Sequence, residues 1–425
     1  MEKALRLALL AFTVRLIVAP FFGHLWDIKT LQETAYYTIE GYNVYELVYM
    51  NSRRVSEALG LPLFYEGYAY PPHLILVILP FYLVYLALGG DPQPIKVYDA
   101  IVGVELLYEL QFHLSKDIFL FLLVIKIPMI LADSLITYML AKHSYKLAFI
   151  YAISPYSIFI TGIWGMFDSL VALALILTIL LLERGRYTLS GLVYGFSLIK
   201  VYTLLVLPII LLHLRSKGLK PLASFSLGLF VSQIPTMVYL ALNPTAFIFT
   251  VIVFHMLRQP SGLTPLRMLS TAENITLTTL TSTIHTVISI MVYVALLAYI
   301  ARYNVSLKVG VTSILLYFLA FSKVVHEQHY LSVYPILLEL RTREARLIEV
   351  LILSYGLINA GLFLVAPTLL FLIDYRFVKL HSSIVYGDLG YLTSSFLGPL
   401  VTSLITIVTF TVTLRTIVKL LERRG

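Results

Sequence analysis

The sequence predicts an all-α membrane protein that crosses the bilayer many times and has a long first outer loop. Of its 425 residues, 59% are hydrophobic and 13% are charged, whereas soluble domains carry about 25% charged residues. The mean hydropathy is +0.88. Apolar stretches near the roughly 20 residues that span a hydrocarbon core recur from Leu5 to Leu421. We expect a single domain over residues 1–425 with about 11–13 spans.

The net charge and the lack of cysteine exclude several classes of function. A net charge of +8 would favour nucleic acid as a partner of a soluble protein, but here the basic residues lie in loops and at helix ends, as membrane topology requires. We therefore expect no nucleic acid partner. The chain has no cysteine, which excludes disulfides, thiolate metal sites and cysteine nucleophiles.

The apolar segments can be placed in order along the chain. Residues 5–22 lack the small-residue cleavage site of a signal peptide, so we interpret them as the first span. Residues 189–212 carry Lys200 in their middle and have to turn back there. Residues 142–146 should lie inside, which needs one crossing more or fewer between residues 89 and 140. Either an extra span lies in 95–112 or some helices are broken, which buried backbone permits. The other expected segments are 72–88, 118–140, 147–161, 170–182, 222–242, 277–300, 309–321, 330–340, 350–373 and 396–420.

Basic loops indicate which ends of the spans face the cytoplasm. These loops are 2–6, 183–186, 214–220, 341–346 and 422–424. With these loops inside, the outer segments are 23–71, 162–169, 258–276, 323–329 and 374–395. The outer segments hold most of the polar residues that do not simply set topology. We therefore expect a functional site on the outer face.

The first candidate group follows the first span and contains Trp26 and Asp27. A carboxylate at the mouth of a span is partly desolvated, so it can act as a general base toward a hydroxyl group. The alternative is an ordinary interfacial acid at a helix end.

The second candidate group lies between two apolar spans and contains Lys323, His326, Glu327, Gln328 and His329. Lys323 and His326 are three residues apart, so on a helix both would face one side and donate to a phosphate oxygen. Glu327 would hold His326 in its charged form. The histidine pair also has the spacing of metal ligands, but without a third convincing ligand we expect no metal. A loop that only sets topology is the alternative.

Buried charges in apolar segments form a third group. Lys200 needs a partner or an aqueous cavity, unless it reaches the interface with its long side chain. Lys126 and Asp133 are two helical turns apart and therefore on one face, where a third group between them or a substrate would neutralise them.

Two more polar positions lie at the outer side. Asp168 follows a glycine-punctuated turn and either caps the next helix or belongs to a site. Arg258 ends a short apolar helix, and its planar fork suits a phosphate group. Contact with lipid head groups is the alternative role for this arginine.

Taken together and in order, these features resemble the GT-C superfamily of polytopic glycosyltransferases, which use polyprenyl-phosphate sugars on the outer or lumenal side. The resemblance covers most of the first 340 residues. It rests on Asp27 and on the stretches 41–45, 68–72, 126–133, 164–169, 200–208 and 323–327. The acidic pair that many relatives carry in the first outer loop is reduced here to Asp27, with Glu33 six residues later.

The resemblance implies an inverting, metal-independent hexosyltransferase of the plasma membrane or endoplasmic reticulum, without a cofactor. It would move mannose or glucose from a polyprenyl or dolichyl phosphate to a lipid-linked glycan or glycolipid, as the enzymes of glycolipid and N-glycan assembly do. Asp27 would be the general base. Lys323, His326, Arg258 and Lys200 would bind the donor phosphate. The residues implied in sugar or acceptor binding are Trp26, Tyr70, Asp168, Glu327 and Gln328.

Two other classes of function remain as alternatives. A secondary transporter or a flippase of lipid-linked oligosaccharides also needs buried charges and broken helices, but it typically has two related halves with charges near the membrane midplane. A non-catalytic membrane scaffold would have no reason to combine carboxylate, histidine and lysine on one face. The gathering of charges at one mouth favours the enzyme.

Overall fold

The computed structural model describes residues 2–59, 67–92, 97–98, 111–112, 118–258, 260–267, 275–358, 365–367 and 397–422. Within these ranges the chain is almost entirely helical. Four helical segments are long and apolar enough to cross a membrane, and two bent helix pairs bring the number to six if each pair is one span. The prediction of an all-α, multi-pass membrane protein is confirmed at this level.

The candidate spans have the following bounds. The four single segments are Glu2–Phe21, which joins α1 (Glu2–Val18) and η1 (Ala19–Phe21), α5 (Ile118–His143), Thr283–Arg302 of α16 (Ile275–Arg302), and Leu400–Glu422 of α23 (Leu397–Glu422). One bent pair joins α6 (Tyr145–Ala152) to α7 (Pro155–Ser157) and η2 (Ile158–Trp164), with a bend of 42°. The other joins α11 (Leu219–Ser232) to α12 (Ile234–Leu242), with a bend of 47°.

Shorter helices and a few strands complete the described chain. The helices are α2 (Leu25–Ile39), α3 (Val44–Leu59), α4 (His73–Ala87), α8 (Asp168–Glu183), α9 (Tyr187–Ser197), η3 (Val201–Val206), α10 (Leu207–Arg215), α13 (Pro244–Ile248), η4 (Phe249–Val253), α14 (Phe254–Leu257), α17 (Leu307–Phe321), η5 (Glu327–Ser332), α18 (Tyr334–Glu339) and α19 (Glu344–Gly356). Strand β1 (Phe22–His24) pairs antiparallel with β6 (Val365–Pro367), and β2 (Val97–Tyr98) pairs with β3 (Gln111–Phe112). Strand β4 (Ser261–Gly262) pairs in parallel with β5 (Val324–Val325).

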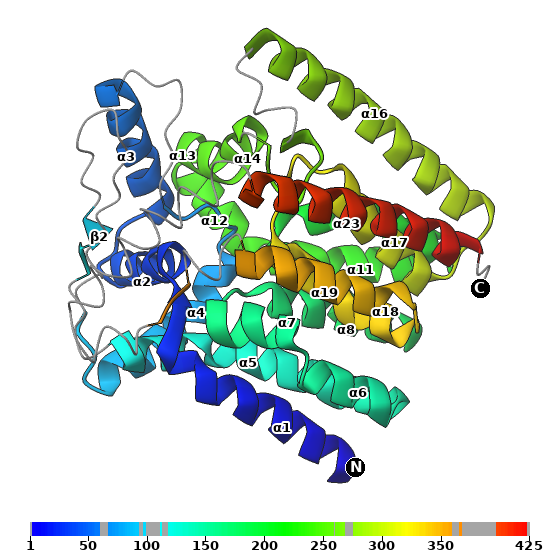
Figure 1. The fold of residues 1–425 in the computed structure, drawn as a ribbon, viewed down its shortest axis with the longest axis horizontal. Coiled ribbons are helices and arrows are strands. Elements are labelled where there is room, and N and C mark those ends of the chain that lie inside the picture. Colours follow the sequence, from blue (N-terminus) through cyan, green and yellow to red (C-terminus); the bar gives the residue numbers. More distant parts are fainter. Residues whose placement is uncertain are drawn as a thin grey trace.

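The helices pack side by side, and the two ends of the bundle differ in content (Figure 1). Helices α2 and α3 lie at one end, on the left of the view, together with the end of α1. Both marked chain ends, the C-terminal end of α16 and helix α18 lie toward the other end of the bundle. The structure thus separates the first outer segment of the sequence analysis from the basic loops.

A buried ion pair joins the first span to α5. Arg15 and Asp133 are both fully buried, and Arg15 Nε donates to Asp133 Oδ2 over 2.6 Å. The hydroxyl groups of Tyr151 and Ser157 also donate to this carboxylate. The expectation that Lys126 and Asp133 share one neutralising group is wrong, because each has its own partners from other helices. A buried charge with this many hydrogen bonds is a structural element of the core.

The segment 189–212 is broken at Lys200, as the sequence predicts. Helix α9 ends at Ser197, and the backbone of Lys200 is extended (φ −106°, ψ 107°) before η3 begins. Of the possible extra span 95–112, the structure describes only β2 and β3. The outer segment 374–395 lies outside the described residues.

Candidate functional site

Asp27 lies in the first turn of α2, directly after β1, and contacts two aromatic side chains. The indole nitrogen of Trp164 donates to Asp27 Oδ2 over 2.8 Å. His24 Nδ1 lies 2.7 Å from the same oxygen. The His24 and Trp164 rings stack with their centroids 4.6 Å apart. Both polar contacts fall on Oδ2, so the position of the carboxylate is fixed through one of its two oxygens.

The electrostatic surroundings keep Asp27 ionised. Burial by itself raises the pKa of Asp27, but the His24 imidazole, the Trp164 indole and the charge of Lys200 outweigh it and hold this pKa below its usual value. The side chain of Asp27 is 24% exposed. It is therefore a partly accessible carboxylate that is charged at neutral pH.

Lys126 holds the segments that carry Asp27 and Trp164 next to each other. This fully buried lysine of α5 directs its Nζ to backbone carbonyl oxygens from both segments. They lie 2.6–3.0 Å away and belong to Ala19, Phe22, Gly162 and Ile163. Gly165 has a φ of +90°, and a Cβ there would lie 2.7 Å from Lys126 Cε. Lys126 is thus a structural residue that positions the site.

Lys200 and Asp168 form a second charged pair near the Tyr70 ring. Lys200 is 5% exposed and Asp168 is fully buried, with 3.3 Å between Nζ and Oδ2. The ammonium group also lies 5.1 Å from the centre of the Tyr70 ring and 4.4 Å from that of Phe167. Lys200 therefore has a carboxylate partner and two aromatic faces. The alternative that its side chain reaches the membrane interface does not apply.

Arg258 and His326 meet through the pairing of β4 with β5. Ser261 N donates to the carbonyl oxygen of Lys323 over 3.0 Å, and this contact sets the two loops side by side. Gly262 has a φ of +78°, and a Cβ there would lie 1.9 Å from Val325 O, so only glycine fits. As a result, Arg258 Nη2 lies 3.0 Å from His326 Nε2.

His326 is neutral in this arrangement, in contrast to the expectation that Glu327 keeps it charged. A guanidinium group can only donate, so Nε2 accepts and carries no proton. Burial and the charges of Arg258 and Lys200 lower the pKa of His326 to about 3. Arg258, not His326, supplies the positive charge at this position.

Lys323 and His326 do not share a face, because β5 is extended where a helix was expected. Lys323 Nζ donates to Met256 O at the end of α14. Burial lowers the pKa of Lys323. His329 accepts a hydrogen bond at Nδ1 from the backbone of His326 over 3.2 Å. In the described part of the chain no three His, Cys, Asp or Glu side chains form a group that could hold a metal.

Glu327 and Gln328 are both buried. The side chain of Glu327 packs against Gly356 of α19, and its carbonyl oxygen accepts from the hydroxyl of Tyr156 over 2.7 Å. Gln328 is 6% exposed. The side chain of Trp26 lies outside the described residues, although its backbone belongs to α2.

The structure brings six of the expected residues into one electrostatic cluster. Burial raises the pKa of Tyr70; the charges of Asp27 and Asp168 raise it further, and that of Arg258 lowers it. The charges of Arg258, Lys200 and Asp27 all act on His326. We refer to Asp27, Tyr70, Asp168, Lys200, Arg258 and His326 as the outer cluster.

Sequence reasoning missed Arg15, the partner of Asp133, although a charge in the middle of an apolar span is a signal for a buried partner. It included Tyr202 only as part of the stretch 200–208 and did not predict that its hydroxyl lies 3.5 Å from Asp168 Oδ1. No protein-family model and no curated protein sequence matches this chain.

Proposed function

We propose that the protein is an integral membrane glycosyltransferase that moves a hexose from a polyprenyl or dolichyl phosphate to a lipid-linked acceptor on the outer face. The observation that supports this most is the outer cluster, in which an ionised, partly exposed carboxylate and a guanidinium group come from segments 231 residues apart in sequence, Asp27 and Arg258. Attack by a hydroxyl and departure of a phosphate need these two charges in one place.

In this proposal Asp27 is the general base. Trp164 and His24 hold Oδ2, so Oδ1 is the oxygen that would accept the proton of the acceptor hydroxyl. A carboxylate with a lowered pKa is a modest base, which suits a reaction whose transition state already carries positive charge on the sugar ring. The acceptor oxygen then attacks the anomeric carbon, the bond to the phosphate oxygen breaks, and the configuration inverts.

Arg258 is the main donor to the leaving phosphate in this proposal. Its guanidinium is fixed on one side by His326, and its planar fork can donate two parallel hydrogen bonds to phosphate oxygens. Lys323 supplies further positive charge beside the end of α14. Lys200 acts at longer range, because Asp168 already neutralises it. Tyr70 presents the ring that would contact the sugar.

The contacts of the buried charges favour an enzyme over a transporter or flippase. Transport of a charged or polar substrate needs polar groups that exchange partners along a path. Instead, Asp133 is bound by Arg15, Lys126 by four carbonyl oxygens, and Lys200 by Asp168.

The test is transfer of radiolabelled mannose or glucose from the polyprenyl-phosphate sugar in proteoliposomes that hold the purified protein and an extract of lipid acceptors. Asp27→Asn should lower the rate of transfer by roughly 10²–10⁴-fold, the usual contribution of a general base. Glu57→Gln is the matched control, since this exposed carboxylate of α3 pairs only with Arg53 one turn away. Normal transfer by Asp27→Asn would refute the role of Asp27, and no transfer by the wild-type protein with either sugar would refute the proposal.

A further inference from the structure

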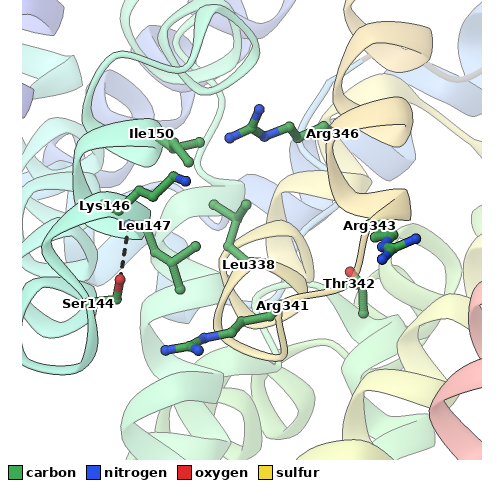
Figure 2. A pocket seen from close by; sticks show the side chains of 9 residues that line it. All are labelled: Ser144, Lys146, Leu147, Ile150, Leu338, Arg341, Thr342, Arg343 and Arg346. Atoms are coloured by element: carbon green, nitrogen blue, oxygen red, sulfur yellow. Dashed lines mark hydrogen bonds between the residues drawn. The ribbon is translucent and has the colours of Figure 1, made fainter.

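A cavity of about 590 Å³ lies at the end of the molecule opposite α2, between the start of α6 and the turn that joins α18 to α19 (Figure 2). Positive side chains from both elements line it, together with the hydroxyl groups of Ser144 and Thr342. The four basic residues are Lys146, Arg341, Arg343 and Arg346. We call this the basic cavity.

The four cations of the basic cavity form no ion pair among the described residues, although Arg341 and Arg343 also border a hollow lined by Glu344 and Glu422. The nearby acids have other partners. Glu339 pairs with Lys308 over 2.7 Å, Glu344 with Lys419, and Glu349 accepts from the hydroxyls of Ser154 and Tyr334. All four cations are exposed, so solvent screens part of their mutual repulsion, and an anion between them would remove more of it.

Arg341 has a left-handed backbone conformation, which glycine adopts more often than other residues. Arg341 has a φ of +53° and follows the end of α18, where its N–H donates to Leu338 O over 2.9 Å. A left-handed residue at the end of a helix is normally glycine, because a Cβ disfavours this conformation. Arg341 thus lies in the turn between α18 and α19, where its side chain lines the cavity.

Apolar residues form the rest of the wall. Leu147, Ile150 and Leu338 line the same cavity. Figure 2 shows Lys146 and Arg346 reaching toward each other from two elements, with Leu147 and Leu338 between Lys146 and the turn. A wall that combines cations and leucines fits a ligand with a phosphate group and a hydrocarbon part better than it fits a small hydrophilic anion.

We propose that the basic cavity binds the phosphate of an anionic glycerophospholipid in the inner leaflet and thereby joins α6 to the α18–α19 turn. The ligand would lie at the end of the bundle opposite the outer cluster, so this site is separate from the proposed transfer site and does not depend on it. Bound lipid would stabilise the folded protein, because the unfolded chain lacks the cavity.

The test uses the full chain in neutral detergent with added phosphatidylglycerol, phosphatidylcholine or inorganic phosphate, and follows the midpoint of thermal unfolding. Phosphatidylglycerol should raise the midpoint, and the other two should not. Arg341→Gln with Arg346→Gln should weaken the apparent affinity for phosphatidylglycerol by about 30-fold. The control pair, Arg215→Gln with Lys217→Gln, removes two exposed cations outside the cavity and should leave the affinity within about twofold.

Two results would overturn the proposal. Equal stabilisation by inorganic phosphate would show that the ligand is a free anion and not a lipid. An equal loss of affinity in the control pair would show that the lipid binds by general surface charge. A gel-filtration profile and an unfolding midpoint in phosphatidylcholine that match those of the wild type ensure that the cavity variant is folded.

Discussion

Arg258 and His326 face each other as a permanent cation and a neutral acceptor, so their contact restricts the protonation of the imidazole. Arg258 Nη2 donates to His326 Nε2 over 3.0 Å. Burial, Arg258, Lys200 and His24 disfavour the protonated form, whereas Asp27 favours it. The balance makes His326 a fixed acceptor that orients the guanidinium group.

This arrangement predicts a loss of stability at mildly acidic pH. The pKa of His326 is about 3 in the folded protein and about 6.5 in the unfolded chain. Only the unfolded chain therefore takes up this proton as the pH falls below about 6.5, which favours unfolding. In His326→Gln, the loss of stability between about pH 7.5 and 5.5 should be smaller by roughly 1.4 kcal/mol.

Thermal unfolding midpoints of the wild type and His326→Gln in detergent across this pH range measure the effect. His143→Gln is a control, because His143 is exposed in the last turn of α5 and does not lie near Arg258. An identical pH dependence in the wild type and His326→Gln would contradict the neutral, buried state of His326.

At the scale of elements, Lys126 joins three parts of the chain, namely the end of the first span, η2 and α5. Its ammonium group is bound by four carbonyl oxygens. The sequence indicated that Lys126 needs partners, but one helix shows only which residues share its own face. The partners come from residues 104 or more positions earlier and 36 or more positions later, so helical periodicity could not identify them.

Lys126→Met should destabilise the protein by about 3 kcal/mol, because the buried carbonyl oxygens lose their donor. This corresponds to a midpoint of thermal unfolding lower by roughly 3–4 °C for a chain of this length. Lys126→Arg should not restore stability, since Gly165 approaches the lysine side chain too closely for a larger group.

Lys142→Met is the matched control, because this exposed lysine lies in the last turn of the same helix, with its ammonium group over the ring of Tyr138. If Lys126→Met unfolded at the wild-type temperature, the role of Lys126 in holding the two segments would be wrong.

At the scale of the whole molecule, the positions of the basic loops predicted that the two ends of the bundle differ, and the hydropathy pattern predicted the all-helical class. Both follow from the cost of placing charge in a hydrocarbon layer, which depends on local composition. The contacts of Asp27 with Trp164 and of Arg258 with His326 join residues 137 and 68 positions apart. Such contacts depend on how helices and short strands pair, and the sequence offered only the residue types that would meet.

The separation of the two ends predicts opposite accessibility of two engineered cysteines. The natural chain has no cysteine, so any labelling of a single-cysteine variant comes from the introduced residue. Glu57 lies in α3, at the end of the bundle that holds the outer cluster. Arg302 is the last residue of α16, near the opposite end (Figure 1). Both positions are exposed. A maleimide that cannot cross membranes should label Glu57→Cys in intact cells and should label Arg302→Cys only after the membrane is opened, because basic loops are expected to face the cytoplasm. Labelling of Arg302→Cys alone in intact cells would reverse the orientation and place the outer cluster on the cytoplasmic side, where a donor on the outer leaflet could not reach it.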